Sequence, residues 1–125
     1  MKSSSLRTVS LSFLATFAVA LPAVAHHGWS GNGEEEFELS GVVETPLSLS
    51  GPHATMQIRV DSQVWDITLA PPARTERAGL KKGVIPKGAQ VKVQGHRNSD
   101  PKRFEVKTER VTYNGKLYNV YPDRT

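Results

Sequence analysis

The chain has 125 residues, no cysteine, and 16 basic against 12 acidic residues, which gives a formal net charge of +4 with the histidines neutral. The absence of cysteine excludes disulfides, thiolate catalysis, iron–sulfur clusters and cysteine zinc sites. A charge balance this mild does not support a nucleic-acid partner, because phosphate binding usually shows as a dense basic stripe.

Residues 1–25 have the organisation of a cleavable secretory signal peptide. Lys2 and Arg7 precede a mostly apolar stretch, and the small residues Ala-Val-Ala at 23–25 end it. A transmembrane helix is the alternative, but it would need about 20 predominantly apolar residues, and this run is shorter and is interrupted by polar residues. We therefore expect a periplasmic or secreted protein that begins at His26 and has no membrane span after cleavage.

The segment after the predicted cleavage site divides into an arm and one domain. Residues 26–36 are rich in glycine and end in three glutamates, which predicts a flexible N-terminal arm. We expect residues 37–125 to form a single domain. About 100 residues remain after cleavage, which suit one small core and leave no room for two.

Apolar residues recur at every second position in five segments of this domain, which is the period of half-buried strands. The first strand begins at Phe37 and ends before a loop that contains Pro46, Gly51 and Pro52. The other expected strands cover 55–60, 63–70, 90–96 and 104–111.

Turn and helix signals lie between these strands. Asp61-Ser62 predicts a hairpin between the second and third strands. The sequence from Pro72 to Gly79 predicts one short helix, with proline in the first turn and glycine just beyond the last. Arg74 and Arg77 lie three residues apart on that helix and form either a small anion patch or a solvated face.

Three strands, a short helix and two further strands are the order of the OB-fold. The fold class predicted is therefore all-β with one short helix, a small OB-like five-stranded barrel. A C-terminal hairpin follows, because Asn114-Gly115 is the preferred pair for a tight primed turn. Gly41 and Gly95 lie where bends of a small barrel would fall. An open antiparallel sheet or a small sandwich is the alternative, since periodicity does not fix closure.

The chemistry that the sequence can support depends on its histidines. Cleavage before His26 would give this residue a free α-amine beside its own imidazole, and these two nitrogens can chelate one metal ion. His27, His53 or His96 could complete a nitrogen-rich set, which favours Cu(II) over zinc and nickel. Copper is therefore the expected cofactor, held by some or all of these four histidines.

Each histidine also has a simpler interpretation. His26 and His27 can be a hydrophilic start that export tolerates. His53 can be a turn residue, and His96 can be a surface residue at a strand end. The sequence does not show whether the four converge.

Signs of catalysis are sparse. The sequence has no nucleophile motif and no phosphate or dinucleotide glycine loop, and we expect Glu105 and Glu109 to face solvent.

Trp65 is predicted to be a core residue. Trp29 in the arm must either pack back on the domain or meet a partner, because an exposed tryptophan is costly.

The order of these motifs resembles a family of small exported bacterial proteins of unknown function. The shared features are the start His26-His27-Gly28-Trp29, the loop Pro52-His53 and the strand end Gly95-His96. The family's loop usually has asparagine where this chain has Gly51, and its Asp-Gly turn is replaced here by Ser99-Asp100-Pro101. The resemblance implies a periplasmic single domain and no activity.

The sequence thus predicts an exported protein that binds a ligand rather than transforming it, with copper as the first candidate ligand. The alternative is a protein or glycan interaction module of the cell envelope that uses the open barrel face and the Trp29 arm. A small hydrolase is the third class and has the least support.

Overall fold

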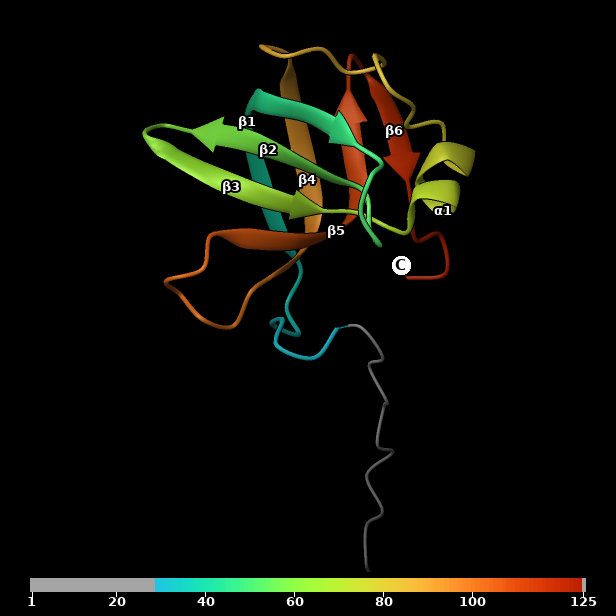
Figure 1. Ribbon diagram of the computed structural model, residues 1–125. Helices are drawn as coiled ribbons and strands as arrows, with labels where there is room; N and C mark the ends of the chain where they lie inside the picture. Colours follow the sequence, from blue (N-terminus) through green and yellow to red (C-terminus); the bar gives the residue numbers. More distant parts are fainter. Residues whose placement is uncertain (1–28, 125) are drawn as a thin grey trace, which may run out of the picture.

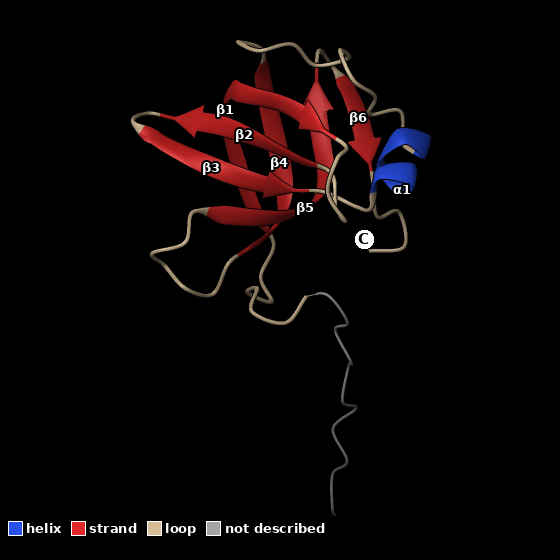
Figure 2. Cartoon of the chain, viewed as in Figure 1, coloured by secondary structure: helices blue, strands red, loops and turns tan. Residues whose placement is uncertain are grey.

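The computed structural model describes residues 29–124, which form six β-strands and one short α-helix (Figures 1 and 2). In chain order the elements are β1 (Phe37–Ser48), β2 (Thr55–Val60), β3 (Gln63–Thr68), α1 (Pro72–Arg77), β4 (Gln90–Arg97), β5 (Glu105–Tyr113) and β6 (Lys116–Asn119).

The strands close into a barrel. Antiparallel pairs join β2 to β3, β2 to β1, β1 to β4 and β4 to β5, and a short parallel pairing between β3 and β5 completes the ring. β6 hydrogen-bonds to β5 outside this ring. The prediction of a small OB-like five-stranded barrel followed by a C-terminal hairpin is confirmed, and the β3–β5 pairing excludes the open sheet.

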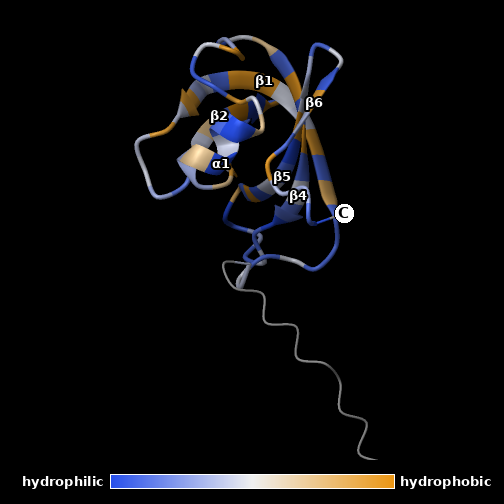
Figure 3. Ribbon diagram, turned by 90° about the vertical axis from the view of Figure 1, so that its right-hand side faces the viewer, coloured by the Kyte–Doolittle hydropathy of each residue, from blue (hydrophilic) through white to orange (hydrophobic). Residues whose placement is uncertain are grey.

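The side chains that the alternation placed inward form the core. Trp65 is 6% exposed, and Ile67 and Leu69 are fully buried beside it in the sequence. Val91 and Val93 of β4 belong to the same buried cluster. Figure 3 shows the resulting alternation of hydrophobic and hydrophilic residues along the strands.

Two glycines permit the close strand contacts of a small barrel. A Cβ atom at Gly95 would lie 2.0 Å from the carbonyl oxygen of Lys107, and one at Gly41 would lie 2.5 Å from that of Arg59. The register between β4 and β5 also shifts between Gln94 and Gly95. Both positions therefore require glycine because the neighbouring backbone occupies the space of a side chain.

The first strand is longer than the sequence predicted. Pro46 was expected in a loop, but β1 continues through it to Ser48. Its register with β2 is irregular between Val43 and Thr45 and again between Thr45 and Ser48. Proline has no N–H and cannot donate a hydrogen bond to the neighbouring strand. An irregular stretch tolerates it because some residues there are left unpaired.

The predicted helix and final turn are confirmed. Pro72 occupies the first turn of α1, and Gly79 follows the helix with a φ of 99°. Asn114 and Gly115 have φ values of 49° and 76°, as a primed hairpin turn between β5 and β6 requires.

Candidate functional site

A second layer of side chains lies outside the barrel, against the outer face of β4 and β5. The described part of the arm and the segment that follows β6 cover this face. We call it the polar layer and define it by six residues: Trp29, His96, Lys107, Glu109, Tyr121 and Arg124.

Backbone and side-chain contacts hold the arm on the barrel. The amide of Gly33 donates to the carbonyl of Arg97 at 2.8 Å, and the side chain of Asn32 donates to the carbonyl of His96 at 3.1 Å. Glu36 forms an ion pair with Arg110 of β5. The arm's described part therefore meets the domain at the end of β4, where His96 lies. Its flexibility stays a prediction.

His96 lies between two hydrogen-bond acceptors. Its Nδ1 is 2.9 Å from the carbonyl oxygen of Gly33, and its Nε2 is 2.9 Å from Oε1 of Glu109. A neutral imidazole carries one N–H, so only the doubly protonated ring donates to both partners at once. The ring is thus fixed in orientation by the arm on one side and by β5 on the other.

Glu109 is the buried carboxylate of the layer. It is 4% exposed, and its Oε1 also accepts a hydrogen bond from Nε of Arg124 at 3.2 Å. The expectation that Glu109 faces solvent is therefore wrong. Glu109 lies at the register shift between β4 and β5, and it bonds to His96 and to Arg124 of the C-terminal segment.

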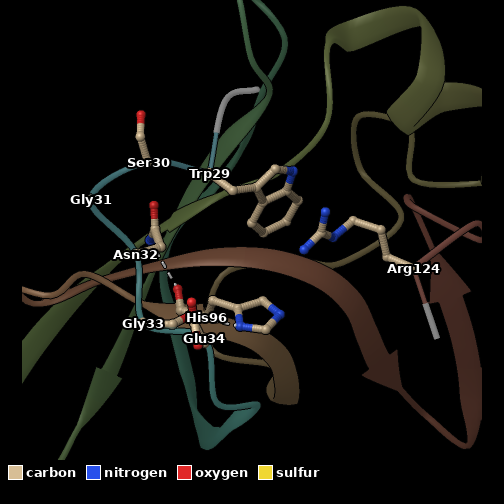
Figure 4. Close-up of a pocket in the computed structure, with 8 residues that line it drawn as sticks. All are labelled: Trp29, Ser30, Gly31, Asn32, Gly33, Glu34, His96 and Arg124. Atoms are coloured by element: carbon tan, nitrogen blue, oxygen red, sulfur yellow. Dashed lines mark hydrogen bonds between the residues drawn. The ribbon is translucent and has the colours of Figure 1, made fainter. Parts of the chain in front are cut away.

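Trp29 packs back on the domain. Its ring contacts His96 edge to face, with centroids 5.5 Å apart, and Tyr121 in the same way at 5.2 Å. Figure 4 shows the guanidinium of Arg124 directed toward the indole, and its central carbon lies 4.1 Å from the ring centroid. Trp29, His96 and Arg124 also line a pocket of about 650 Å³ with residues of the arm.

Burial changes the acid–base properties of neighbouring groups. Desolvation lowers the pKa of Lys107, which Glu105 partly offsets by raising it. Desolvation likewise raises the pKa of Tyr121. Burial and then the charge of Lys107 lower the pKa of His53, which favours neutral imidazole, the form that binds metals.

The predicted metal ligands are only partly covered by the structure. His96 lies in the polar layer. His53 is a partly buried residue of the loop between β1 and β2. His26 and His27 lie outside the described residues. Within residues 29–124, no three histidine, aspartate or glutamate side chains form a metal-binding group. Convergence of the four histidines on one ion thus stays a prediction.

The outer surface of β1–β3, the other candidate for binding, carries polar side chains that bond to one another. Arg59 donates two hydrogen bonds to Glu44, while Gln57 donates to Asp66 and accepts from Thr45. These exposed groups bond to one another across the strands.

The fold and the site define a small closed β-barrel with an aromatic and charged layer built from its N- and C-terminal segments. The chain belongs to a family of unknown function (DUF6152), whose model matches residues 15–107. No curated protein matches the sequence. Across residues 29–124, no helix has the length and hydropathy needed to cross a membrane.

Two solved structures are similar to part of this chain. The crystal structure of the ZRD-deleted mutant of TiaS in complex with agmatine is 16% identical, with a TM-score of 0.51, over 69% of this chain and 26% of that one. The crystal structure of TiaS in complex with an isoleucine tRNA, AMPCPP and agmatine is 19% identical, with a TM-score of 0.47, over 63% of this chain and 18% of that one. The chain thus spans about a quarter of the first structure's length, and the likeness concerns the fold alone.

Proposed function

We propose that this protein is an exported binding protein that holds a copper ion at the junction of its mature N-terminus and the polar layer. The α-amine and imidazole of His26 supply two nitrogens, His96 supplies a third, and the carboxylate of Glu109 beside it supplies an oxygen. The observation that carries the proposal is the pairing of His96 with Glu109 beside Trp29, the first residue of the arm that the structure describes.

The geometry of this pair suits a metal with adjacent ligand positions. Two donors about 2.0–2.1 Å from one ion, at right angles, are about 2.9 Å apart, and Nε2 of His96 and Oε1 of Glu109 are separated by 2.9 Å. That distance is also an ordinary hydrogen bond. A bound ion would take the place of the proton that the two groups share.

The hydrogen bond on the other side of the imidazole also favours a metal. Nδ1 of His96 donates to the carbonyl of Gly33, so Nε2 is the nitrogen left for coordination. A backbone carbonyl on the second nitrogen is the usual partner of a metal-binding histidine, because it fixes the tautomer and the ring orientation.

The chain length before Trp29 is short enough for the proposed ligands to meet. An extended chain spans at most about 3.6 Å per residue, and His26 and His27 precede Trp29 by three and two residues. The reach of His26 from Trp29 is therefore about 11 Å at most, while the indole of Trp29 contacts His96 directly.

The rival function, a protein or glycan module that uses Trp29, has less support. A sugar ring stacks on a free aromatic face, and Arg124 lies over the indole of Trp29. The open face of β1–β3 is occupied by mutually bonded polar side chains.

The test is a Cu(II) titration of protein that begins at His26, compared with protein that carries a longer N-terminal tag. The tag turns the α-amine of His26 into an amide and leaves every imidazole in place. Its first three residues must lack histidine, because an amine, two amides and a histidine in third position form a different copper site. We expect the tag to weaken copper binding at least about 10- to 100-fold, because loss of a group that only orients a ligand already has an effect of that size.

The matched variants are His96→Gln and His53→Gln in the processed protein. We expect His96→Gln to weaken copper binding by a similar factor. The variants His53→Gln and His27→Gln then show whether either of these imidazoles is a further ligand of the copper ion. Thermal unfolding of each variant without metal separates loss of a ligand from loss of the fold. Equal copper affinity in the tagged and processed proteins would refute the amine site.

A further inference from the structure

Three cationic side chains surround the two aromatic rings of the polar layer. Nζ of Lys107 lies 5.5 Å from the ring centroid of Trp29 and 5.9 Å from that of Tyr121. The guanidinium of Arg124 lies over Trp29, and that of Arg74 lies 5.4 Å from the centroid of Tyr121. Cations over aromatic faces are a common contact, but three around one pair of rings concentrate positive charge.

Lys107 is the unusual member of this group. It is 7% exposed and forms no hydrogen bond or ion pair with its ammonium group among residues 29–124. Glu109, which lies two residues away on the same face of β5, is already bonded to His96 and Arg124. No buried side-chain nitrogen or oxygen among the described residues lacks a hydrogen-bond partner. The ammonium of Lys107 therefore reaches solvent although the rest of its side chain is buried, and an anion from solution can approach it.

Arg124 has N–H donors that could bind the same anion. Its Nε is directed to Glu109, which leaves the terminal nitrogens of the guanidinium on the side of the Trp29 ring (Figure 4). An arginine fork and a lysine ammonium are the side chains that proteins use to bind carboxylate and phosphate oxygens.

We propose that Lys107 and Arg124 hold the oxyanion group of a small ligand against the rings of Trp29 and Tyr121. The oxyanion is a carboxylate or a phosphate, and the rings give the ligand an apolar wall beside its charge. The pocket lined by Trp29 and Arg124 offers about 650 Å³ for the rest of the molecule. This site adjoins the proposed copper site, because Arg124 donates to Glu109. Neither Lys107 nor Arg124 is itself a proposed metal ligand, so the oxyanion can be tested on metal-free protein.

The test uses metal-free protein and two probes, inorganic phosphate and acetate, followed by two-dimensional ¹H–¹⁵N NMR. The indole N–H of Trp29 reports on the site, and that of the core residue Trp65 is an internal reference. We expect one or both probes to shift the Trp29 signal in a saturable way while Trp65 stays in place. The probe that binds more tightly identifies the oxyanion class.

The decisive variant is Lys107→Met, which keeps the length of the side chain and removes the charge. We expect it to weaken the binding of the better probe about tenfold or more, as loss of a hydrogen bond to a charged group does. Lys116→Met is the matched control, because Nζ of Lys116 lies 5.0 Å from the ring centroid of Tyr118, outside the polar layer. It should bind the probe as the unaltered protein does.

An anion bound at this site should also stabilise the fold. Saturating probe should raise the melting temperature of the unaltered protein and have little effect on Lys107→Met. Arg124→Met provides a second variant if the first fails to fold. Lack of any Trp29 shift with both probes, or unchanged binding after loss of Lys107, would overturn the oxyanion site. That result would not bear on the copper proposal, because all of these measurements are made without metal and copper binding is tested by its own titration.

Discussion

Gly95 shows how one residue determines the path of two strands. Its Cα faces the backbone of β5, where a Cβ would lie 2.0 Å from the carbonyl oxygen of Lys107. The sequence marked this glycine as a bend or bulge from its position within an alternating strand. The distance supplies the physical reason, because no rotamer change can move a backbone carbonyl away.

We therefore predict that Gly95→Ala destabilises the protein by at least about 2 kcal/mol, as overpacking of a closely packed site does. Urea unfolding followed by circular dichroism measures the change. Gly33→Ala is the control, because its Cβ would lie 3.7 Å from the nearest atom, an ordinary contact. A Gly95→Ala protein as stable as Gly33→Ala would contradict the close approach.

His96 and Glu109 mark the limit of prediction at the same scale. Glu109 was expected to face solvent, but it is only 4% exposed. The prediction of exposure failed because the segments around Trp29 and Arg124, which cover Glu109, have no periodic pattern that would reveal where they pack. The buried pair could not be predicted from spacing, since the two residues are 13 positions apart.

At the scale of elements, the short helix is the most complete prediction. Its proline start and glycine end follow from local chemistry, so sequence alone places α1 (Pro72–Arg77) within about two residues. Thr75 connects the helix to the end of β3. Its hydroxyl is fully buried and donates to the carbonyl of Ala70 at 2.9 Å.

We predict that Thr75→Val lowers the free energy of unfolding by about 0.5–1.5 kcal/mol, the net contribution of one hydrogen bond. The carbonyl of Ala70 loses this donor but keeps the amide of Ala54, and the side-chain volume is nearly unchanged. Chemical denaturation measures the effect. Thr75→Ser, which keeps the hydroxyl and loses a methyl group, separates the hydrogen bond from packing. If the valine variant were as stable as the unaltered protein, the hydroxyl would contribute nothing.

Strand β1 shows why element boundaries are harder to predict than element types. Proline and glycine signals after Val43 indicated a loop, and the structure continues the strand to Ser48 through two irregular steps. A bulge is a property of the pairing between two strands. The sequence of one strand therefore carries little information about it.

For the whole molecule, the periodicity predicted the succession of strands, whereas the barrel was predicted only from the similarity of that succession to the OB-fold. The succession of periods predicted five strands with a helix after the third. Closure depends on three parallel residue pairs, from Asp66 with Glu105 to Thr68 with Lys107. No local sequence pattern specifies a pairing between residues that are 39 positions apart, so the β3–β5 pairing is seen only in the three-dimensional structure.

Export is a prediction about the whole chain. Protein recovered from the cell envelope should have an intact mass that corresponds to a start at His26, because small residues at 23 and 25 follow the apolar run. Mass spectrometry of the fractionated envelope measures this directly. Recovery of full-length chain in the membrane fraction would contradict both the location and the free amine proposed for copper binding.

The parallel closure of the barrel also constrains the order in which the chain can fold. β2 and β3 form a local hairpin as soon as both are present, but the second edge of β3 has no partner until residues 105–107 are available. Until then an unpaired strand edge is exposed, which invites association with other chains. Pairings between distant segments also slow folding. The hairpin with an open edge is consequently a state in which the chain is exposed to aggregation.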